Sequence, residues 1–304
     1  MKISKNSVRK MNSEKLIALN QAGFIPGPNE AEEKFIERVK FAGQFFKDKN
    51  SFFEKVQITP PFPLDDKVTK PLRHWTRSQL IRRFDITPDF LQIYFHDKGL
   101  AFFQGAATWL LELDNKITFP LIQLRVGLKK GRYLGLYSFD EILAHETVHA
   151  ARAAFDEKIF EEHFAYLTSS SFLRRIFGPI IRNTWEVIIF FALFLLVFAF
   201  IFLPASPLLS YAGNFSFFGL MGYASLGFFR LFKNRLFFVL ALKKLKKILQ
   251  SKDKAFFVLF RLTDKEIFKF ARISRKKILA YVEQEKEKSL RWKVIYQAYF
   301  AGSK

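Results

Sequence analysis

The sequence contains no cysteine among its 304 residues. Disulfide bonds are therefore excluded, and so is a zinc site built on thiolates, which leaves histidine and carboxylate side chains as the possible protein ligands of a metal ion. The absence of cysteine is compatible with a reducing compartment. The first thirty residues also lack an apolar core of signal-peptide length, so we expect no cleaved leader.

Charged residues are absent from two segments in the second half of the chain. Residues 187–203 consist only of Val, Ile, Leu, Phe and Ala, and this composition predicts a helix that spans a bilayer, the alternative being a helix buried in a soluble core. Residues 208–229 are also uncharged, although they include Asn214, three serines and four glycines. Together with a turn at residues 204–207, the two segments predict a transmembrane helical hairpin over residues 184–230.

Positive charge lies on both sides of the predicted hairpin. Three arginines precede the first span and seven lysines or arginines follow the second: Arg174, Arg175 and Arg182, then Arg230, Lys233, Arg235, Lys243, Lys244, Lys246 and Lys247. The positive-inside rule then predicts an integral membrane protein with both termini in the cytoplasm. Residues 230–304 hold 21 Lys and Arg against 6 Asp and Glu, which is +15 of the formal net charge of +21. We expect this basic region to bind anionic lipid headgroups and no nucleic acid.

The segment His145-Glu146-Thr147-Val148-His149 has a pattern with a specific chemical meaning. On a helix, His145 and His149 project only about 40° apart, so both can bind one metal ion. Glu146 projects to the side, where it can accept a proton from water. The alternative is a solvent-facing helix on which the two histidines bind nothing. Charged residues flank the motif, namely Asp140, Glu141 and Arg152, so we expect an aqueous site and not one inside a membrane span.

A helix start lies shortly before this motif. Ser138 begins an S-x-x-E sequence typical of a capping box, which predicts a helix from Phe139. A helix that carries H-E-x-x-H resembles the active-site helix of the zincin metallopeptidases. The resemblance implies a Zn²⁺ cofactor bound by His145 and His149, Glu146 as the general base, and a peptide or protein substrate.

A zincin site needs a third protein ligand, which leaves the fourth position for water. Two acidic residues, Asp156 and Glu157, predict the start of a second helix over residues 158–170. On this helix Glu162 and Tyr166 would share one face. The predicted helix is therefore the place to look for the third ligand.

The string Glu162-His163-Phe164-Ala165-Tyr166 resembles the glutamate helix of the gluzincins. This resemblance implies Glu162 as the third zinc ligand, while Glu161 and Glu157 remain alternatives. Tyr166 stands where thermolysin-like enzymes carry an aspartate that orients a ligand histidine, and its phenol can hydrogen-bond an imidazole N–H. No residue can be assigned to stabilise an oxyanion, and the nearest polar candidates in the sequence are His163, Tyr133 and Tyr137.

Two runs of mostly apolar, β-branched or aromatic residues precede the motif, at residues 108–113 and 117–124. The dipeptide Asp114-Asn115 between them predicts a β-hairpin. Pro120 lies inside the second run, and because proline cannot donate to a strand ladder, we expect that run to be an edge strand. The zincin resemblance implies that this edge strand can hold an extended peptide by β-augmentation, the alternative being a strand that only covers a core.

We therefore predict an α+β fold in three parts. Residues 1–183 form a cytoplasmic zincin-like domain with the active-site helix, the glutamate helix and the edge-strand hairpin. Residues 184–230 form the transmembrane hairpin, and residues 231–304 form a basic helical cytoplasmic region. In this last region Thr263 and Glu266 predict a capping box for a helix that extends toward Ala280. Whether it folds back onto the zinc domain or lies along the membrane is left open, since an amphipathic helix suits either surface.

These patterns favour a membrane-anchored zinc peptidase that hydrolyses peptide bonds. The alternative is a non-enzymatic membrane anchor or scaffold in which the metal site is structural or absent. An open coordination position distinguishes the two, because a structural zinc site is closed by a fourth protein ligand.

Overall fold

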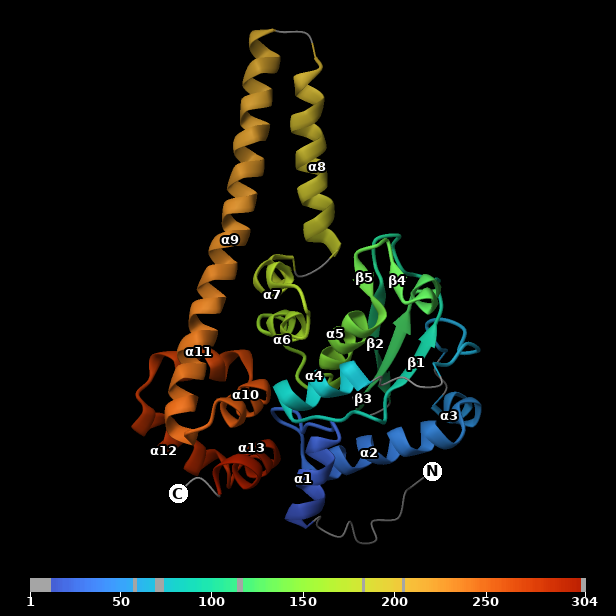
Figure 1. Ribbon diagram of the computed structural model, residues 1–304, viewed down its shortest axis with the longest axis vertical. Helices are drawn as coiled ribbons and strands as arrows, with labels where there is room; N and C mark the ends of the chain where they lie inside the picture. Colours follow the sequence, from blue (N-terminus) through green and yellow to red (C-terminus); the bar gives the residue numbers. More distant parts are fainter. Residues whose placement is uncertain are drawn as a thin grey trace.

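The computed structural model has a mixed α+β fold that is mostly helical, which confirms the predicted fold class at this level. A domain of helices around a small sheet carries a long helical hairpin that projects from one end (Figure 1). The structure describes residues 12–56, 59–68, 74–113, 117–181, 184–203 and 206–301. The helices are α1 (Ser13–Gln21), α2 (Glu32–Lys47), α3 (Lys49–Val56), α4 (His74–Phe84), α5 (Phe139–Ala151), α6 (Glu161–Leu167), α7 (Phe172–Phe177), α8 (Thr184–Ile201), α9 (Pro207–Leu249), α10 (Lys252–Phe260), α11 (Asp264–Arg272), α12 (Arg275–Glu285) and α13 (Leu290–Ile295). The strands are β1 (Gln92–Phe95), β2 (Ala106–Leu113), β3 (Ile117–Leu124), β4 (Arg132–Tyr133) and β5 (Tyr137–Ser138).

A three-stranded sheet in the order β1-β3-β2 supports the helix that carries the histidines. β2 and β3 pair antiparallel from Ala106 opposite Leu124 to Leu113 opposite Ile117, which confirms the predicted pairing of the two runs. The predicted turn at Asp114-Asn115 lies outside the described residues. β1 pairs with β3 in the parallel direction.

The prediction that the strand containing Pro120 lies at an edge of the sheet is wrong. β3 is the central strand, with β2 on one side and β1 on the other. Proline is tolerated there because β1 is short and its pairing with β3 begins only at Leu121. The missing N–H of Pro120 therefore removes no hydrogen bond from that ladder. The edge strand of the hairpin is β2.

The helix α5 begins at Phe139, as predicted, and packs against β2 and β3. Its N-cap is Ser138, whose hydroxyl oxygen accepts the N–H of Glu141 at 3.3 Å. In a capping box the Glu141 carboxylate would turn back to Ser138. Instead it accepts the N–H of Ser170 at 2.7 Å and pairs with Arg174 at 2.9 Å. Glu141 thereby fixes the segment that follows α6 to the helix of the histidines.

The second helix of the site, α6, is shorter than the predicted 158–170 and begins only at Glu161. The acidic residues before it do not start it. Asp156 has a φ of 51°, in the left-handed region, and Glu157 accepts the backbone N–H of Asp264. The Asp264 carboxylate in turn accepts the N–H groups of the last two residues before the helix, at 2.8 and 3.1 Å. A residue of the C-terminal region therefore sets the start of α6.

The C-terminal region folds back onto the two helices of the site, which answers the question that the sequence leaves open. One buried core combines residues from both parts of the chain: Phe84, Val148, Phe164, Phe238, Phe260, Ile267 and Trp292. Arg152, fully buried just after α5, donates to the carbonyls of Phe260 and Leu262. The helices α5 and α6 thus rest on the C-terminal helices and not only on the sheet.

Thr263 and Glu266 form the predicted capping box at the start of α11. The helix ends at Arg272 and does not continue to Ala280, because the Ser274 side chain caps a new helix, α12, through the N–H of residue 277 at 3.4 Å. A polar cap in the middle of a predicted helix thus divides it in two.

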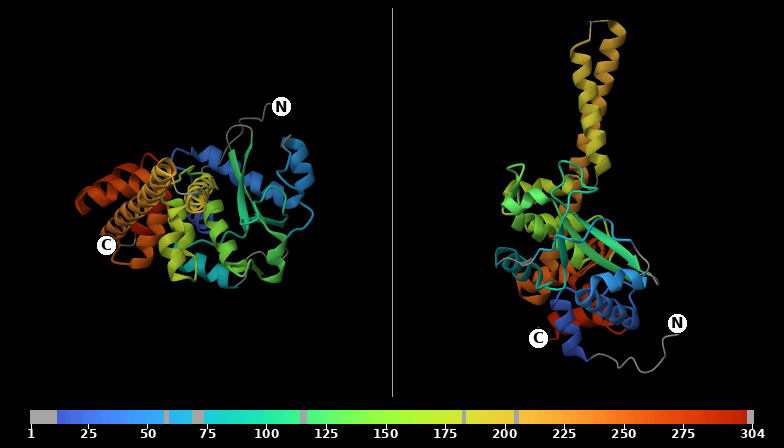
Figure 2. Two further views of the ribbon diagram at one scale, coloured as in Figure 1. Left: turned by 90° about the horizontal axis from the view of Figure 1, so that it is seen from above. Right: turned by 90° about the vertical axis from the view of Figure 1, so that its right-hand side faces the viewer.

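α8 and the first half of α9 lie side by side and form the projecting hairpin (Figures 1 and 2). α9 is one continuous helix of 43 residues, about 65 Å long. It is long and apolar enough to cross a membrane, and a second span is counted only if α8 is taken together with the bent segment Phe172–Ile180 before it. The second half of α9 enters the domain core, where Leu231, Ala241 and Leu245 are buried. Arg182 and residues 204–205 of the predicted turn lie outside the described residues.

Candidate metal centre

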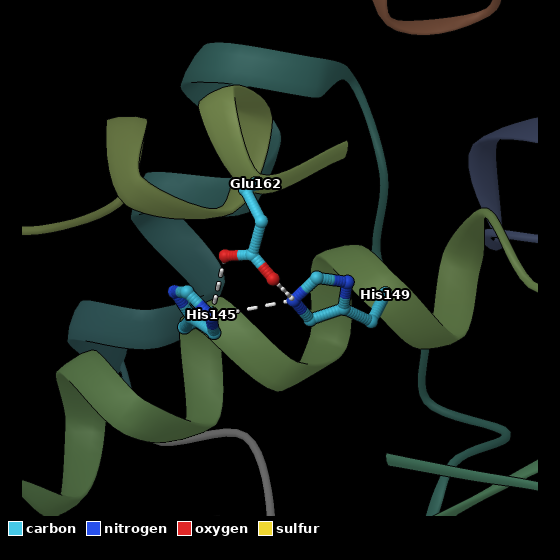
Figure 3. A group of neighbouring side chains, drawn as sticks. All are labelled: His145, His149 and Glu162. Atoms are coloured by element: carbon cyan, nitrogen blue, oxygen red, sulfur yellow. Dashed lines mark hydrogen bonds and ion pairs between the residues drawn. The ribbon is translucent and has the colours of Figure 1, made fainter. Parts of the chain in front are cut away.

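His145 and His149 project from the same side of α5, one turn apart (Figure 3). Their Nε2 atoms lie 3.3 Å apart. The opposite side of the helix is anchored by buried residues, among them Leu143 and Thr147. Both histidine side chains are half-buried, so solvent can reach them while the helix beneath them is held by the core.

Glu162 projects from α6 toward the two histidines (Figure 3). Its Oε2 lies 3.6 Å from His145 Nε2, and its Oε1 lies 3.5 Å from His149 Nε2. Zinc binds imidazole nitrogen and carboxylate oxygen at about 2.0–2.2 Å in a tetrahedral arrangement, which places the ligand atoms about 3.3–3.6 Å from one another. The Nε2–Nε2 separation falls in this range. The two distances from Nε2 to Glu162 run to different carboxylate oxygens, and one ligand atom from each of the three residues lies within 4.8 Å of the others, so the side chains present can gather around such an ion.

The neighbouring Glu161 has a different position. Its Oε1 lies 2.7 Å from Nδ1 of His149, on the side of the ring opposite to Nε2. An Nδ1–H that donates to this carboxylate leaves Nε2 of the neutral ring available to a metal ion and fixes the ring orientation. Glu161 is thus placed to orient His149, whereas Glu157 faces Asp264. Of the three acidic candidates, Glu162 is the one grouped with both histidines.

Tyr166 contacts His145 through its aromatic ring, whereas the sequence suggested a hydrogen bond by its phenol group. The two ring centroids are 4.7 Å apart and the planes meet at 74°. The phenol ring also packs tightly on the backbone of Gly178, where a Cβ would lie 2.3 Å from Tyr166 Cδ1. Tyr166 therefore holds His145 by an edge-on aromatic contact and needs a glycine beneath it.

The general-base candidate Glu146 faces the sheet. Its side chain is 8% exposed, and its Oε2 accepts a hydrogen bond from the hydroxyl of Thr108 on β2 at 2.7 Å. Thr108 was not singled out from the sequence. The available signal was a hydroxyl residue in a mostly apolar run that precedes the motif. Its bond holds one carboxylate oxygen of Glu146 against β2.

Burial and charge give the two histidines different pKa values. Burial and the neighbouring His149 hold the pKa of His145 well below its usual value. Burial also acts to lower the pKa of His149, but the hydrogen bond to Glu161 and the charges of Glu162 and Glu161 outweigh it and raise the pKa to about 9. The site therefore combines a neutral imidazole with one held by carboxylates.

Two carboxyl groups of the site, those of Glu162 and Glu146, have pKa values above their usual range. Burial raises the pKa of Glu162 to about 7, with His149 acting against it and Glu146 and Glu161 adding to it. Burial likewise raises the pKa of Glu146, although His149 acts against it. Three carboxyl groups that face one small region repel one another when ionised, and a divalent cation would relieve that repulsion.

The three residues considered for stabilising an oxyanion, His163, Tyr133 and Tyr137, make contacts elsewhere. His163 points toward α9, with its ring 6.4 Å from that of Phe238. The Tyr133 hydroxyl donates to the carbonyl of Phe102 at 2.6 Å. The ring of Tyr137 lies beneath the Arg174 guanidinium at 5.5 Å. None of these contacts involves His145, His149 or Glu162.

Comparisons with protein-family models, with curated proteins and with solved structures found no match to this chain.

Proposed function

We propose that this protein is a membrane-anchored zinc peptidase of the zincin type. The observation that carries the proposal is the convergence of His145, His149 and Glu162 from two helices, with one ligand atom of each within 4.8 Å of the others. Glu146, one residue along α5 from the first ligand, is turned toward the edge strand β2. Two nitrogens and one carboxylate oxygen are the donor set of a catalytic zinc site.

The residues divide the work of peptide hydrolysis. When bound, a zinc ion supplies Lewis acidity, which lowers the pKa of water toward about 7 and polarises a carbonyl. Glu146 accepts the proton of the attacking water and delivers it to the leaving amine. Thr108 holds Glu146 in place through one oxygen, and Glu161 orients the His149 ring. The raised pKa of Glu146 suits a group that must both accept and release a proton.

The outer edge of β2 is the proposed seat of the substrate. Among the described residues β2 pairs only with β3, so no described strand pairs with its other edge, which is where we place an extended peptide. Thr108 on this strand is bonded to Glu146, which places the strand beside the proposed base. The zincin resemblance implies that an edge strand binds the substrate. Because β2 and not β3 is the edge strand of the hairpin, we assign this role to β2.

The alternative of a scaffold with a structural zinc site requires a fourth protein ligand. Three other acidic residues near the ligands are engaged in other contacts: Glu146 with Thr108, Glu161 with His149 Nδ1 and Glu157 with Asp264. Within the described part of the chain, the metal-binding group that includes the histidines has three members. This arrangement supports a site with one open position.

Metal content and hydrolysis test the proposal together. The purified full-length protein in detergent should contain about one zinc per chain by mass spectrometry, and it should cleave a mixture of fluorogenic peptides. A chelator should abolish the cleavage and added Zn²⁺ should restore it. Bound zinc without any hydrolysis would instead support the structural role.

The hairpin is proposed to cross the membrane with both termini and the metal centre on the cytoplasmic side. A reporter that works only in the cytoplasm should be active when fused after Arg182 and after Lys304, whereas a fusion at Ser206 should report the opposite side. If the reporter at Lys304 reads as exported, α9 does not return the chain across the bilayer.

Anionic headgroups are the proposed lipid partners. A groove between α9 and α11 is lined by four cations, Lys233, Lys265, Lys269 and Arg272. All four are exposed, and Lys233 lies one turn beyond Arg230, where the uncharged part of α9 ends. Cations this close to the end of a membrane-spanning segment lie within a Debye length of headgroup phosphates.

A further inference from the structure

The membrane boundary can be located on the hairpin from its first charges. Arg230 is the first charged residue after the uncharged part of α9. It pairs with both carboxylate oxygens of Glu186 on α8 at 2.8 Å and donates to the carbonyl of Ile180 at 2.7 Å. Trp185, beside Glu186, is 71% exposed. Paired charges next to an exposed tryptophan are typical of the interface between lipid and water.

The short helix α7 lies at the same level. Phe177 at its end contacts Phe228 of α9, with ring centroids 6.3 Å apart. Ile180, just after α7, packs against Gly227, where a Cβ would lie 3.4 Å from the isoleucine side chain. Both contacts fall within three residues of Arg230. α7 is therefore fixed beside the end of the membrane-spanning part of α9.

Exposed apolar side chains gather at this level. On α7, Phe172 is 65% and Leu173 is 64% exposed. In the turn between β4 and β5, Leu134 is 53% and Leu136 is 63% exposed. We call these four residues the apolar rim. The β4–β5 turn and α7 both lie at the end of the domain that faces the hairpin (Figure 1).

The turn is built in a way that exposes its leucines. Leu134 has a φ of 52°, in the left-handed region that a leucine rarely adopts. Such a conformation is unfavourable for a residue with a Cβ, and here it presents an apolar side chain to solvent. Lys130 and Arg132, just before the turn, are exposed as well. Apolar tips flanked by cations match the interfacial layer of an anionic membrane.

The two parts of the rim are joined to each other and to the metal-site helix. Arg174 of α7 pairs with Glu141 on α5 at 2.9 Å and donates to the carbonyl of Leu136 in the turn. The Arg174 guanidinium also lies over the ring of Tyr137. The contacts of Arg174 thus fix the positions of both α7 and the turn relative to α5.

We propose that the apolar rim rests in the headgroup layer of the bilayer beside the hairpin, as a second point of membrane contact. The lipid surface is the occupant because the rim continues the apolar surface of α8 and α9 at the level of Arg230, and because its flanking charges are positive. A rigid domain held by a hairpin and a rim has one orientation on the membrane.

This docking places the metal centre close to the bilayer. His145 contacts Tyr166, and Tyr166 packs on Gly178, two residues before Ile180, which lies against Gly227 near the middle of α9. If the proposed peptidase function holds, the substrates are polypeptide segments that lie close to the membrane surface. The docking itself does not depend on that function.

Fluorescence quenching by lipids tests the proposal, and the absence of native cysteine makes single labels possible. The variants Leu173→Cys and Leu136→Cys are labelled with an environment-sensitive dye in the full-length protein. Leu195→Cys on α8 marks the hairpin. Leu279→Cys on α12 is the matched control, since Leu279 is an exposed leucine far from the hairpin. Each protein is reconstituted into vesicles of phosphatidylcholine and phosphatidylglycerol, with or without brominated acyl chains.

We expect brominated lipid to quench the labels at 173, 136 and 195 and to leave the label at 279 unchanged. Labels at 173 and 136 that behave like the one at 279, while 195 is quenched, would refute docking of the rim and leave the hairpin in place. Loss of quenching at 195 as well would refute the hairpin and the rim together. None of these readouts requires hydrolysis, so they are independent of the proposed peptidase activity.

Discussion

Replacing Glu146 with glutamine should reduce peptide hydrolysis by about a hundredfold or more while zinc stays bound. Glutamine keeps the shape of the side chain, and its carbonyl oxygen can still accept the hydrogen bond from Thr108. It cannot take a proton from water at neutral pH, because an amide is a far weaker base than a carboxylate. Steady-state hydrolysis of a fluorogenic peptide and metal analysis of the same sample measure the two effects.

Glu112→Gln is the matched control for this experiment. Glu112 lies on β2, on the same strand as Thr108, but it is exposed. The control variant should keep both zinc and activity. Undiminished hydrolysis by Glu146→Gln would reject the proposed base, and loss of zinc from that variant would mean that Glu146 belongs to the ligand set.

The features that the sequence predicts correctly are local ones. The start of α5 depends on Ser138 and its neighbours, and the separation of His145 and His149 depends only on the helical repeat. The pairing of β2 with β3 likewise follows from two adjacent runs. Such features are determined by residues close in the chain, so a single sequence contains the information.

The features that the sequence predicts wrongly depend on distant partners. The strand order places β1, from well before the hairpin, beside β3, and this makes the strand of Pro120 central. The start of α6 depends on Asp264, and the Glu141 carboxylate is drawn to Ser170 and Arg174. Helix propensity and capping patterns carry no information on these contacts.

The same limit applies within the site. The spacing of Glu161 and Glu162 on a helix allows either one to face the histidines, since they are only about 100° apart. The choice depends on how α6 is rotated against α5, which the packing of Phe164 and Ala165 in the core fixes. The hydroxyl of Thr108 reaches Glu146 only because β2 runs beside α5. Both contacts require the assembled fold.

Glutamine substitutions at Glu162, Glu161 and Glu157 should have different effects on zinc binding: a large loss, a small loss and no change, in that order. Glu162→Gln should have the largest effect, because a neutral amide is a poor replacement for a carboxylate on a divalent cation. Glu161→Gln should cost about tenfold in affinity, at the low end for residues that orient a ligand, since the amide oxygen can still accept the Nδ1–H of His149. Glu157→Gln should bind zinc like the unaltered protein, because Glu157 faces Asp264. Chelator competition on the three purified variants measures the order.

The series also tests the rotation of α6 directly, because the three variants carry the same chemical change and differ only in position. If Glu161→Gln loses zinc and Glu162→Gln retains it, α6 is turned by about 100° from the arrangement in the structure. In that case the edge contact of Tyr166 with His145 would not survive either, since Tyr166 lies one turn after Glu162 on the same face.

A Tyr166→Phe variant separates the ring from the hydroxyl. It should bind zinc normally, because the observed contact with His145 is made by the ring.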